Sequence, residues 1–509
     1  MTLSNFTQAP WKNSHEVYQA SPLSISPAPE YANSEVLVAS LYRIIGFAGI
    51  SESKVSPAGR ELEQRLQKLR DKRGSSPKEA TLEVEGWNTV LHGVLESPKL
   101  PNQSAQRFLQ VTPLVPALAP FSGAARLKGN PWSPGNLIRR MVWLGSPSHQ
   151  AAQSLWSSLF TALSIEAEDD VFARWLEREV PSWGTGATWQ EAPVPPNEVS
   201  ALPDDDFTNM SFMPARQFTK DLKALIQVKH TMTRRQWTSL LESILRVAAV
   251  THVTWLCDVQ DRLWRCLSEA VDGGGPSGDL ATRSRVFPSQ APYMAYGGKA
   301  LQGLKDKASS YLSARLSINA LLWSLDDLGL PYRGSIGSSK GIAQLCEHVR
   351  TNRQALLAAE FGARVAEIRE QEAKTLGCKK GIGSNLLEFA RHVLGQRQTA
   401  IQLLRGYDQG YILKKKGSSN SSPWVVSLGP VAVLALVHCA LSGMGGPRSI
   451  HKLGDHLGAY GIAVDRADIA RNDLGNQLRM LGLVLDSPDA ESGMLLLPPF
   501  DAHLVMDKK

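Results

Sequence analysis

The feature that most constrains the fold is a long helical pattern between Thr233 and Leu267. Apolar side chains such as Trp237 and Leu241 recur three and four positions apart, and Thr233 is placed to cap the first turn. The pattern ends at a Gly-rich stretch, which predicts a flexible loop over residues 272–293. Because helical signals dominate the chain, we expect a mainly α, multi-domain protein.

Breaker-rich stretches divide the chain into predicted units. Further helices are expected near residues 36–47, 136–144, 150–165 and 169–180. The predicted units are a disordered or extended leader (1–33), an N-terminal helical domain (34–182), a linker or long loop (183–215), a central long-helix region (216–271), a flexible loop (272–293), a basic helical domain (294–426), a C-terminal module (427–500) and a tail (501–509).

Composition places the chain among ordinary globular proteins. It has 509 residues, of which 43% are hydrophobic and 20% charged. The 5 cysteines are widely spaced, and none forms a CxxC or Cys/His metal pattern, so reduced thiols and no cofactor are expected. The first thirty residues contain no apolar signal core, and we expect no apolar run to span a membrane. These observations predict a cytoplasmic protein.

The C-terminal module contains three predicted helices. An apolar run at residues 428–441 has Pro430 in its first turn and ends at a glycine cluster. A second helix is expected over residues 449–460. Asp465 is expected to cap a third helix that extends to Leu481 and turns its apolar face inward.

Two short apolar segments follow these helices, at residues 483–485 and 494–497, with a polar turn between them. Three helices and one hairpin in this order resemble the winged-helix variant of the helix-turn-helix, which occurs in many DNA-binding proteins. The outward face of the third helix would then carry Asn472, Asn476 and Arg479, residue types that reach base edges and phosphates.

The net charge of this module weakens the expectation of DNA binding. Residues 427–509 contain seven Lys and Arg against nine Asp and Glu. Because phosphate neutralisation supplies most non-specific affinity for DNA, an acidic module binds DNA poorly on its own. DNA contact and docking of a partner protein therefore both remain open for this module.

The strongest basic excess lies between Arg333 and Lys416. This region holds fifteen Lys and Arg against seven Asp and Glu, an excess as large as that of the whole chain, whose net charge is +7. A helical region with this excess is the best candidate for an electrostatic footprint on nucleic acid.

Three Gly- or Ser-rich loops in this region can present backbone N–H groups and a cation to a phosphate. The alternative is that these loops are ordinary solvated turns. None of them has the spacing of a nucleotide-hydrolysing Walker loop. The cations that they supply are Lys340 in the first loop (333–341), Lys379 and Lys380 in the second (377–384), and Lys414, Lys415 and Lys416 in the third (414–419).

No catalytic motif is found in the sequence. His451 and His456 are five positions apart on a predicted helix and cannot converge on one metal ion. The acidic run at residues 204–206 lacks the companion residues of a nuclease site. We expect a protein that is not an enzyme, although a site assembled from residues with no local motif stays open.

The sequence therefore predicts a non-catalytic, nucleic-acid-binding protein, with DNA favoured over RNA. It would act with a protein partner as a subunit of a larger bacterial DNA-processing or phage-defence complex. In a phage-defence complex its role would be antiviral. The alternative is a scaffold or adaptor that uses its winged-helix-like module to dock a partner protein.

Overall fold

Helices make up most of the structure. The computed structural model describes residues 2–10, 13–25, 34–48, 50, 83, 85–86, 113–121, 133–179, 187–290, 292–376, 382–396, 410–417, 422–467, 469, 471–486 and 494–500. Strands within these residues are short, so the predicted mainly α, multi-domain class is confirmed.

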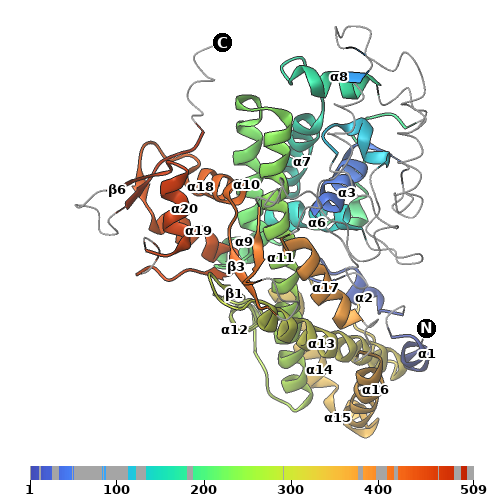
Figure 1. The fold of residues 1–509 in the computed structure, drawn as a ribbon. Helices are drawn as coiled ribbons and strands as arrows, with labels where there is room; N and C mark the ends of the chain where they lie inside the picture. Colours follow the sequence, from blue (N-terminus) through green and yellow to red (C-terminus); the bar gives the residue numbers. More distant parts are fainter. Residues whose placement is uncertain are drawn as a thin grey trace.

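The long helix α11 (Arg234–Val271) runs through the middle of the molecule (Figure 1). It begins as predicted: the Thr233 hydroxyl accepts from the Gln236 N–H at 3.4 Å, and the Gln236 side chain accepts from the Thr233 N–H at 3.0 Å. Contrary to the sequence analysis, this helix is long and apolar enough to cross a membrane, but its apolar window is 100% buried by the rest of the protein. It packs like the central helix of a hydrophobic core.

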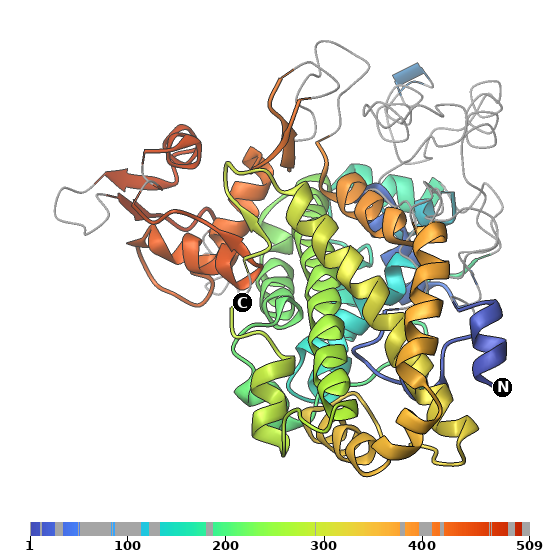
Figure 2. The same cartoon turned by 90° about the horizontal axis from the view of Figure 1, so that it is seen from below.

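Helices from both halves of the chain cover α11. The helix α13 (Leu301–Asp327) lies along it (Figure 2), and α10 (Pro214–Gln227), α3 (Ser34–Gly46) and α18 (Pro430–Leu441) contact it as well. Their buried apolar side chains form a single continuous cluster.

The predicted helices of the N-terminal region are confirmed. Three of them are α6 (Pro134–Gly145), α7 (His149–Leu163) and α8 (Val171–Glu179), and α3 is the fourth. Further helices in the described part of the chain include α14 (Ser339–Thr351), α15 (Arg353–Ala358), α16 (Phe361–Leu376), α17 (Ile382–Leu394) and the 3-10 turns η1 (Pro116–Phe121), η3 (Pro196–Glu198) and η4 (Lys229–Thr231).

The leader is helical and packed where the structure describes it, so its prediction as disordered or extended was wrong. It contains α1 (Leu3–Gln8) and α2 (Glu16–Gln19), and the side chain of Phe6 is fully buried. The His15 N–H donates to Oδ1 of Asn319 in α13 at 2.7 Å. Both helices contact α13, which the Pro- and Ser-rich composition of the segment did not indicate.

The predicted linker or long loop and the predicted flexible loop also contain helices. Residues 272–293 include α12 (Asp279–Val286), and residues 183–215 include α9 (Asp204–Asn209). Asp206 in α9 is buried and accepts from Nε of Arg283 at 3.0 Å and from the Ser339 N–H at 2.7 Å. This carboxylate therefore joins α9 to α12 and to the first turn of α14.

The C-terminal module contains α18, α19 (His451–Ala459) and α20 (Asp473–Met480). Its strands β4 (Arg448–Ser449), β6 (Val484–Asp486) and β7 (Met494–Leu496) form an antiparallel sheet in the order β4-β7-β6. A parallel pair, β1 (Met294–Ala295) and β5 (Ile462–Ala463), joins this module to the body.

The third helix of the module is shorter than predicted. We expected it to begin at Asp465, but Asp465 accepts from the Ala467 N–H at 3.0 Å, which closes a local turn. The helix begins only at Asp473, after Asn472 has capped it. Both Asp465 and Asn472, seven residues later, are residue types that cap helices, and the structure uses Asn472.

Buried arginines connect the elements of the body. Arg43, Arg234, Arg246 and Arg315 are at most 2% exposed. Each donates to backbone carbonyl oxygens of another element, as Arg43 does to Ala119 at 2.9 Å. Carbonyl oxygens can accept from much of a buried guanidinium, and Nη1 of Arg234 also lies 3.9 Å from Oδ1 of Asp169, so these side chains fix the packing of distant segments.

Candidate nucleic-acid interface

A β-hairpin of strands β2 (Ile412–Lys415) and β3 (Trp424–Ser427) projects from the body (Figure 2). We predicted Lys414, Lys415 and Lys416 in a loop, but the first two lie in β2 because β3 supplies a partner strand. Since successive strand residues point to opposite faces, Lys414 and Lys415 lie on opposite faces of the hairpin.

The base of this hairpin is attached to the core. The Gln396 N–H, just after α17, donates to the carbonyl of Leu413 at 2.7 Å. Buried Arg246 of α11 donates to the carbonyls of Val393 and Leu394 at 2.8 and 3.0 Å. These carbonyls belong to the last turn of α17, where a helix has acceptors without intrahelical donors. Arg246 therefore fixes the helix end that carries the hairpin.

The lysines of the hairpin lie next to aromatic rings. Nζ of Lys414 is 5.0 Å from the ring centroid of Tyr411, and Nζ of Lys415 is 5.6 Å from that of Trp424. Both rings are half-buried, and Lys416 is exposed at the end of β2. Ammonium groups at this distance are attracted to the ring face. The hairpin thus combines three cations with two aromatic surfaces.

A fourth lysine joins this site from a distant part of the sequence. Lys299 pairs with Val425 of β3 through an isolated bridge, and its side chain is exposed. The sequence analysis missed Lys299, because the pairing of residues 299 and 425 is set by the tertiary fold and leaves no local signal.

Lys340 is exposed in the first turn of α14, but the N–H groups around it are used inside the protein. The Ser339 N–H donates to Asp206 at 2.7 Å, and the Gly341 N–H donates to Oγ of Ser338 at 3.1 Å. This loop can offer a phosphate the Lys340 side chain, without the amide cradle that we expected. Lys379 and Lys380 of the second predicted loop lie outside the described residues.

The three polar residues predicted to read bases from the third helix lie in three different environments. Asn472 is the N-cap of α20, and its Oδ1 accepts from the Leu474 N–H at 2.9 Å. Nη2 of Arg479 donates to Oδ1 of Asp486 in β6 at 3.2 Å. Asn476 is exposed. Two of the three predicted base-reading side chains therefore make contacts within the module.

A buried polar cluster attaches the C-terminal module to α10. Asp221 is 1% exposed and accepts from the Tyr460 hydroxyl at 2.7 Å and from the Gln217 amide at 2.7 Å. His456 Nε2 lies 3.0 Å from the same carboxylate. Burial and the Asp221 charge raise the pKa of Tyr460 well above its usual value, so the hydroxyl remains a donor.

The sequence analysis considered His456 only as a possible metal ligand, because its partner Asp221 lies 235 positions away. Within the described residues, no group of three or more His, Cys, Asp or Glu side chains could hold a metal ion. The Asp221 cluster is thus explained by the contact between α10 and α19.

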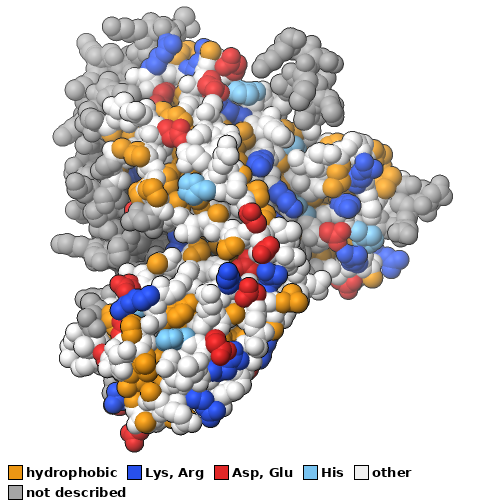
Figure 3. Space-filling view, turned by 180° about the vertical axis from the view of Figure 1, so that it is seen from behind, with side chains coloured by type: hydrophobic (Ala, Val, Ile, Leu, Met, Phe, Trp, Pro, Cys, Tyr) orange, Lys and Arg blue, Asp and Glu red, His pale blue; other side chains and the backbone are white. Residues whose placement is uncertain are grey.

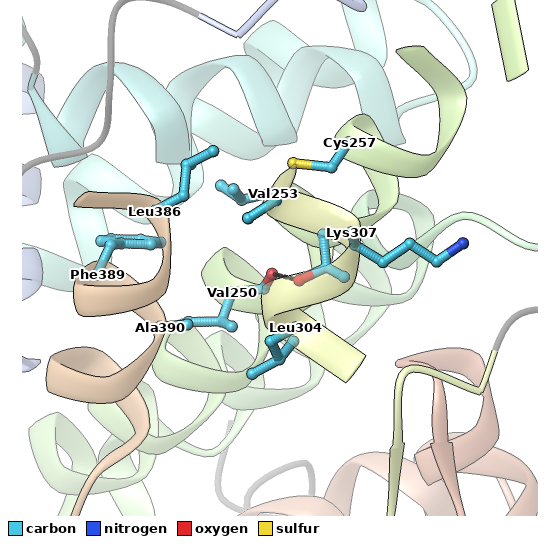
Figure 4. Close-up of a pocket in the computed structure, with 10 residues that line it drawn as sticks. Val250, Val253, Cys257, Leu304, Lys307, Leu386, Phe389 and Ala390 are labelled. Atoms are coloured by element: carbon cyan, nitrogen blue, oxygen red, sulfur yellow. Dashed lines mark hydrogen bonds between the residues drawn. The ribbon is translucent and has the colours of Figure 1, made fainter. Parts of the chain in front are cut away.

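A small recess lies between α11, α13 and α17 (Figure 4). Val250, Leu304 and Phe389 contribute to its apolar lining, and Lys307 points away from it. Nζ of Lys307 contacts Oδ1 of Asp258 at 2.6 Å. The space holds about one water molecule, which is too small for a substrate.

The face opposite to that of Figure 1 carries Lys and Arg side chains interspersed with Asp and Glu (Figure 3). Mixed charge of this kind does not form a broad surface for phosphate binding. The concentration of cations on the β2–β3 hairpin is therefore the more specific feature.

Comparison with known proteins finds no family model and no curated protein that matches this chain. The functional argument consequently rests on the geometry of the hairpin and of the C-terminal module.

Proposed function

We propose that this protein is a non-catalytic subunit that binds nucleic acid, DNA in preference to RNA, through the β2–β3 hairpin. In this proposal the chain works with a protein partner in a larger bacterial DNA-processing or phage-defence assembly. The observation that carries it is the set of three consecutive lysines, two of them over aromatic rings, on a hairpin whose base is hydrogen-bonded to the core.

Three properties of the hairpin support phosphate binding. Lys414 and Lys416 are exposed, and Lys299 adds a cation beside β3. The anchoring of its base by Arg246 limits the conformational entropy lost on binding. Strand β2 of the hairpin also lies in the region with the strongest basic excess, residues 333–416. Cations on a fixed element contribute affinity that falls with salt.

The test is a salt titration of full-length protein with a fluorescent oligonucleotide. Replacement of Lys414, Lys415 and Lys416 by alanine should weaken binding to all sequences alike and lower the slope of log affinity against log salt by roughly 2 to 3.

The matched control replaces three exposed lysines elsewhere, Lys220 and Lys223 in α10 and Lys305 in α13. It changes the net charge equally and should leave the slope close to that of the unmodified protein. An equal loss in both variants would show that only net charge matters, and unchanged binding in the hairpin variant would refute the proposal.

The second candidate is a docking adaptor that uses the C-terminal module. The order of its elements, with three helices and the sheet β4-β7-β6, supports the proposed winged-helix likeness. Arg479 is engaged by Asp486, and the Met480 side chain is 86% exposed on the same helix. An exposed methionine is more typical of a protein contact than of a phosphate contact.

To separate the two candidates, Met480→Glu would be compared with the unmodified protein for oligonucleotide affinity and for co-purification with a partner from the native host. Loss of the partner with unchanged oligonucleotide affinity would favour the adaptor role for this module.

A further inference from the structure

We infer that the β2–β3 hairpin binds single-stranded nucleic acid, with bases stacked on Trp424 and Tyr411 and phosphates held by the neighbouring lysines. This inference rests on the proposed function and specifies which form of nucleic acid the hairpin takes.

The first argument is the arrangement of rings and cations. Each of the two strand lysines has an aromatic ring within reach on its own side, Lys414 with Tyr411 at 5.0 Å and Lys415 with Trp424 at 5.6 Å. A base can take the place of the ammonium group over the ring while the lysine moves to the adjacent phosphate. Each face of the hairpin thus carries one ring beside one cation, and this combination binds single strands without sequence preference, because every base has a π face.

The second argument is the fixed position of the Trp424 ring. A Cβ on Gly395 would lie 3.6 Å from Cη2 of Trp424, so the indole packs against the end of α17. Gly395 in turn accepts from buried Arg246 at 3.4 Å and pairs with Leu413 of β2. A ring held in this way loses little freedom when a base stacks on it.

The third argument concerns duplex nucleic acid. Paired bases hide their faces in the helical stack, so an aromatic ring on a hairpin reaches them only if a base is unstacked. Recognition of a duplex would depend on α20, where Asn472 caps the helix and Arg479 contacts Asp486. The structure thus offers a stacking surface on the hairpin and few unused polar groups on α20.

The experiment measures fluorescence anisotropy of full-length protein with a labelled oligo(dT) strand and with a labelled duplex of equal length. We expect the single strand to bind more tightly. Trp424→Ala should weaken single-strand binding roughly ten-fold or more and change duplex binding little. Trp424→Phe, which keeps a ring, should retain most of the affinity.

Phe172→Ala is the matched control, because Phe172 is 47% exposed on α8, outside the hairpin. It should leave both affinities unchanged. Thermal melts of each variant show whether it folds, and the single-strand to duplex ratio of the unmodified protein decides the question independently of any variant.

Equal affinity for the two oligonucleotides, or equal losses for both in Trp424→Ala, would overturn this inference and leave the proposed function standing. Absence of binding to either oligonucleotide at low salt would instead overturn the proposed function itself.

Discussion

The β2–β3 hairpin and helix α20 use their polar side chains in opposite ways. In the hairpin, Lys414 and Lys416 are exposed and the strands rest on a base held by Arg246. In α20, Asn472 stabilises the first turn and Arg479 pairs with Asp486. Residue type alone therefore does not identify a binding surface; what matters is which groups the fold leaves available.

The two regions also differ in their attachment to the body. The hairpin is held at its base by carbonyl acceptors, whereas the module of α20 is held by the buried carboxylate of Asp221. A charge at 1% exposure is stable only while its hydrogen-bonding partners stay in place. The module should thus be more sensitive to single substitutions at its contact than the hairpin.

The largest expected effect is that of Asp221→Ala. The change leaves Tyr460 and Gln217 without their acceptor and should lower the free energy of unfolding by about 1–3 kcal/mol for each unsatisfied donor. Urea denaturation measures this loss, and Asp221→Asn, which keeps an acceptor, should lose less. Oligonucleotide affinity under native conditions should remain that of the unmodified protein, because the hairpin is anchored elsewhere. Affinity that fell together with stability would show that the two regions bind as one unit.

Asn472→Ala should have a smaller effect. Removal of an N-cap costs about 1 kcal/mol, and this loss should appear as a lower unfolding midpoint with unchanged oligonucleotide affinity. Asn472→Asp or Asn472→Ser should restore stability, since both side chains can cap a helix. If the alanine variant instead changed sequence preference at constant stability, Asn472 would be a base-reading residue.

The smallest expected effect is a pH dependence at His438 in α18. Burial lowers the pKa of His438 below its usual value, although the Ala224 carbonyl and Asp221 of α10 oppose this shift. Also close to this imidazole is the ring of Phe500, at 5.3 Å. The folded protein therefore favours neutral His438. The resulting contribution to the free energy of unfolding is present above the pKa that His438 has in the unfolded chain. It is lost as the pH falls through the lowered pKa of the folded protein.

Thermal melts between about pH 7 and about pH 5 test this expectation. The melting temperature should fall more steeply with falling pH for the unmodified protein than for His438→Asn. Identical slopes would show that His438 contributes nothing to the pH dependence.

Local signals in the sequence were enough to predict several helices of the body. Thr233 capped α11 as expected, and the apolar spacing located α6, α7, α8 and α18 within a few residues. These features depend on neighbouring residues, which a sequence displays directly.

The misplaced features depend on residues that are distant in sequence. The leader is ordered by contacts with α13 more than three hundred positions away, as between His15 and Asn319 with a separation of 304. Lys414 and Lys415 lie in a strand only because Trp424–Ser427 pairs with it, and Lys299 joins the site by tertiary pairing. No window along the chain contains both partners of such a contact.

The most direct test of the account compares two variants in one titration, the triple alanine substitution of Lys414, Lys415 and Lys416 and the double substitution Asn476→Ala with Arg479→Ala. Both would be titrated with the same labelled single strand at physiological salt. The account predicts that the hairpin variant loses roughly ten-fold or more in affinity, whereas the α20 variant binds like the unmodified protein. Loss of binding in the α20 variant, with the hairpin variant unaffected, would contradict it and make α20 the nucleic-acid contact.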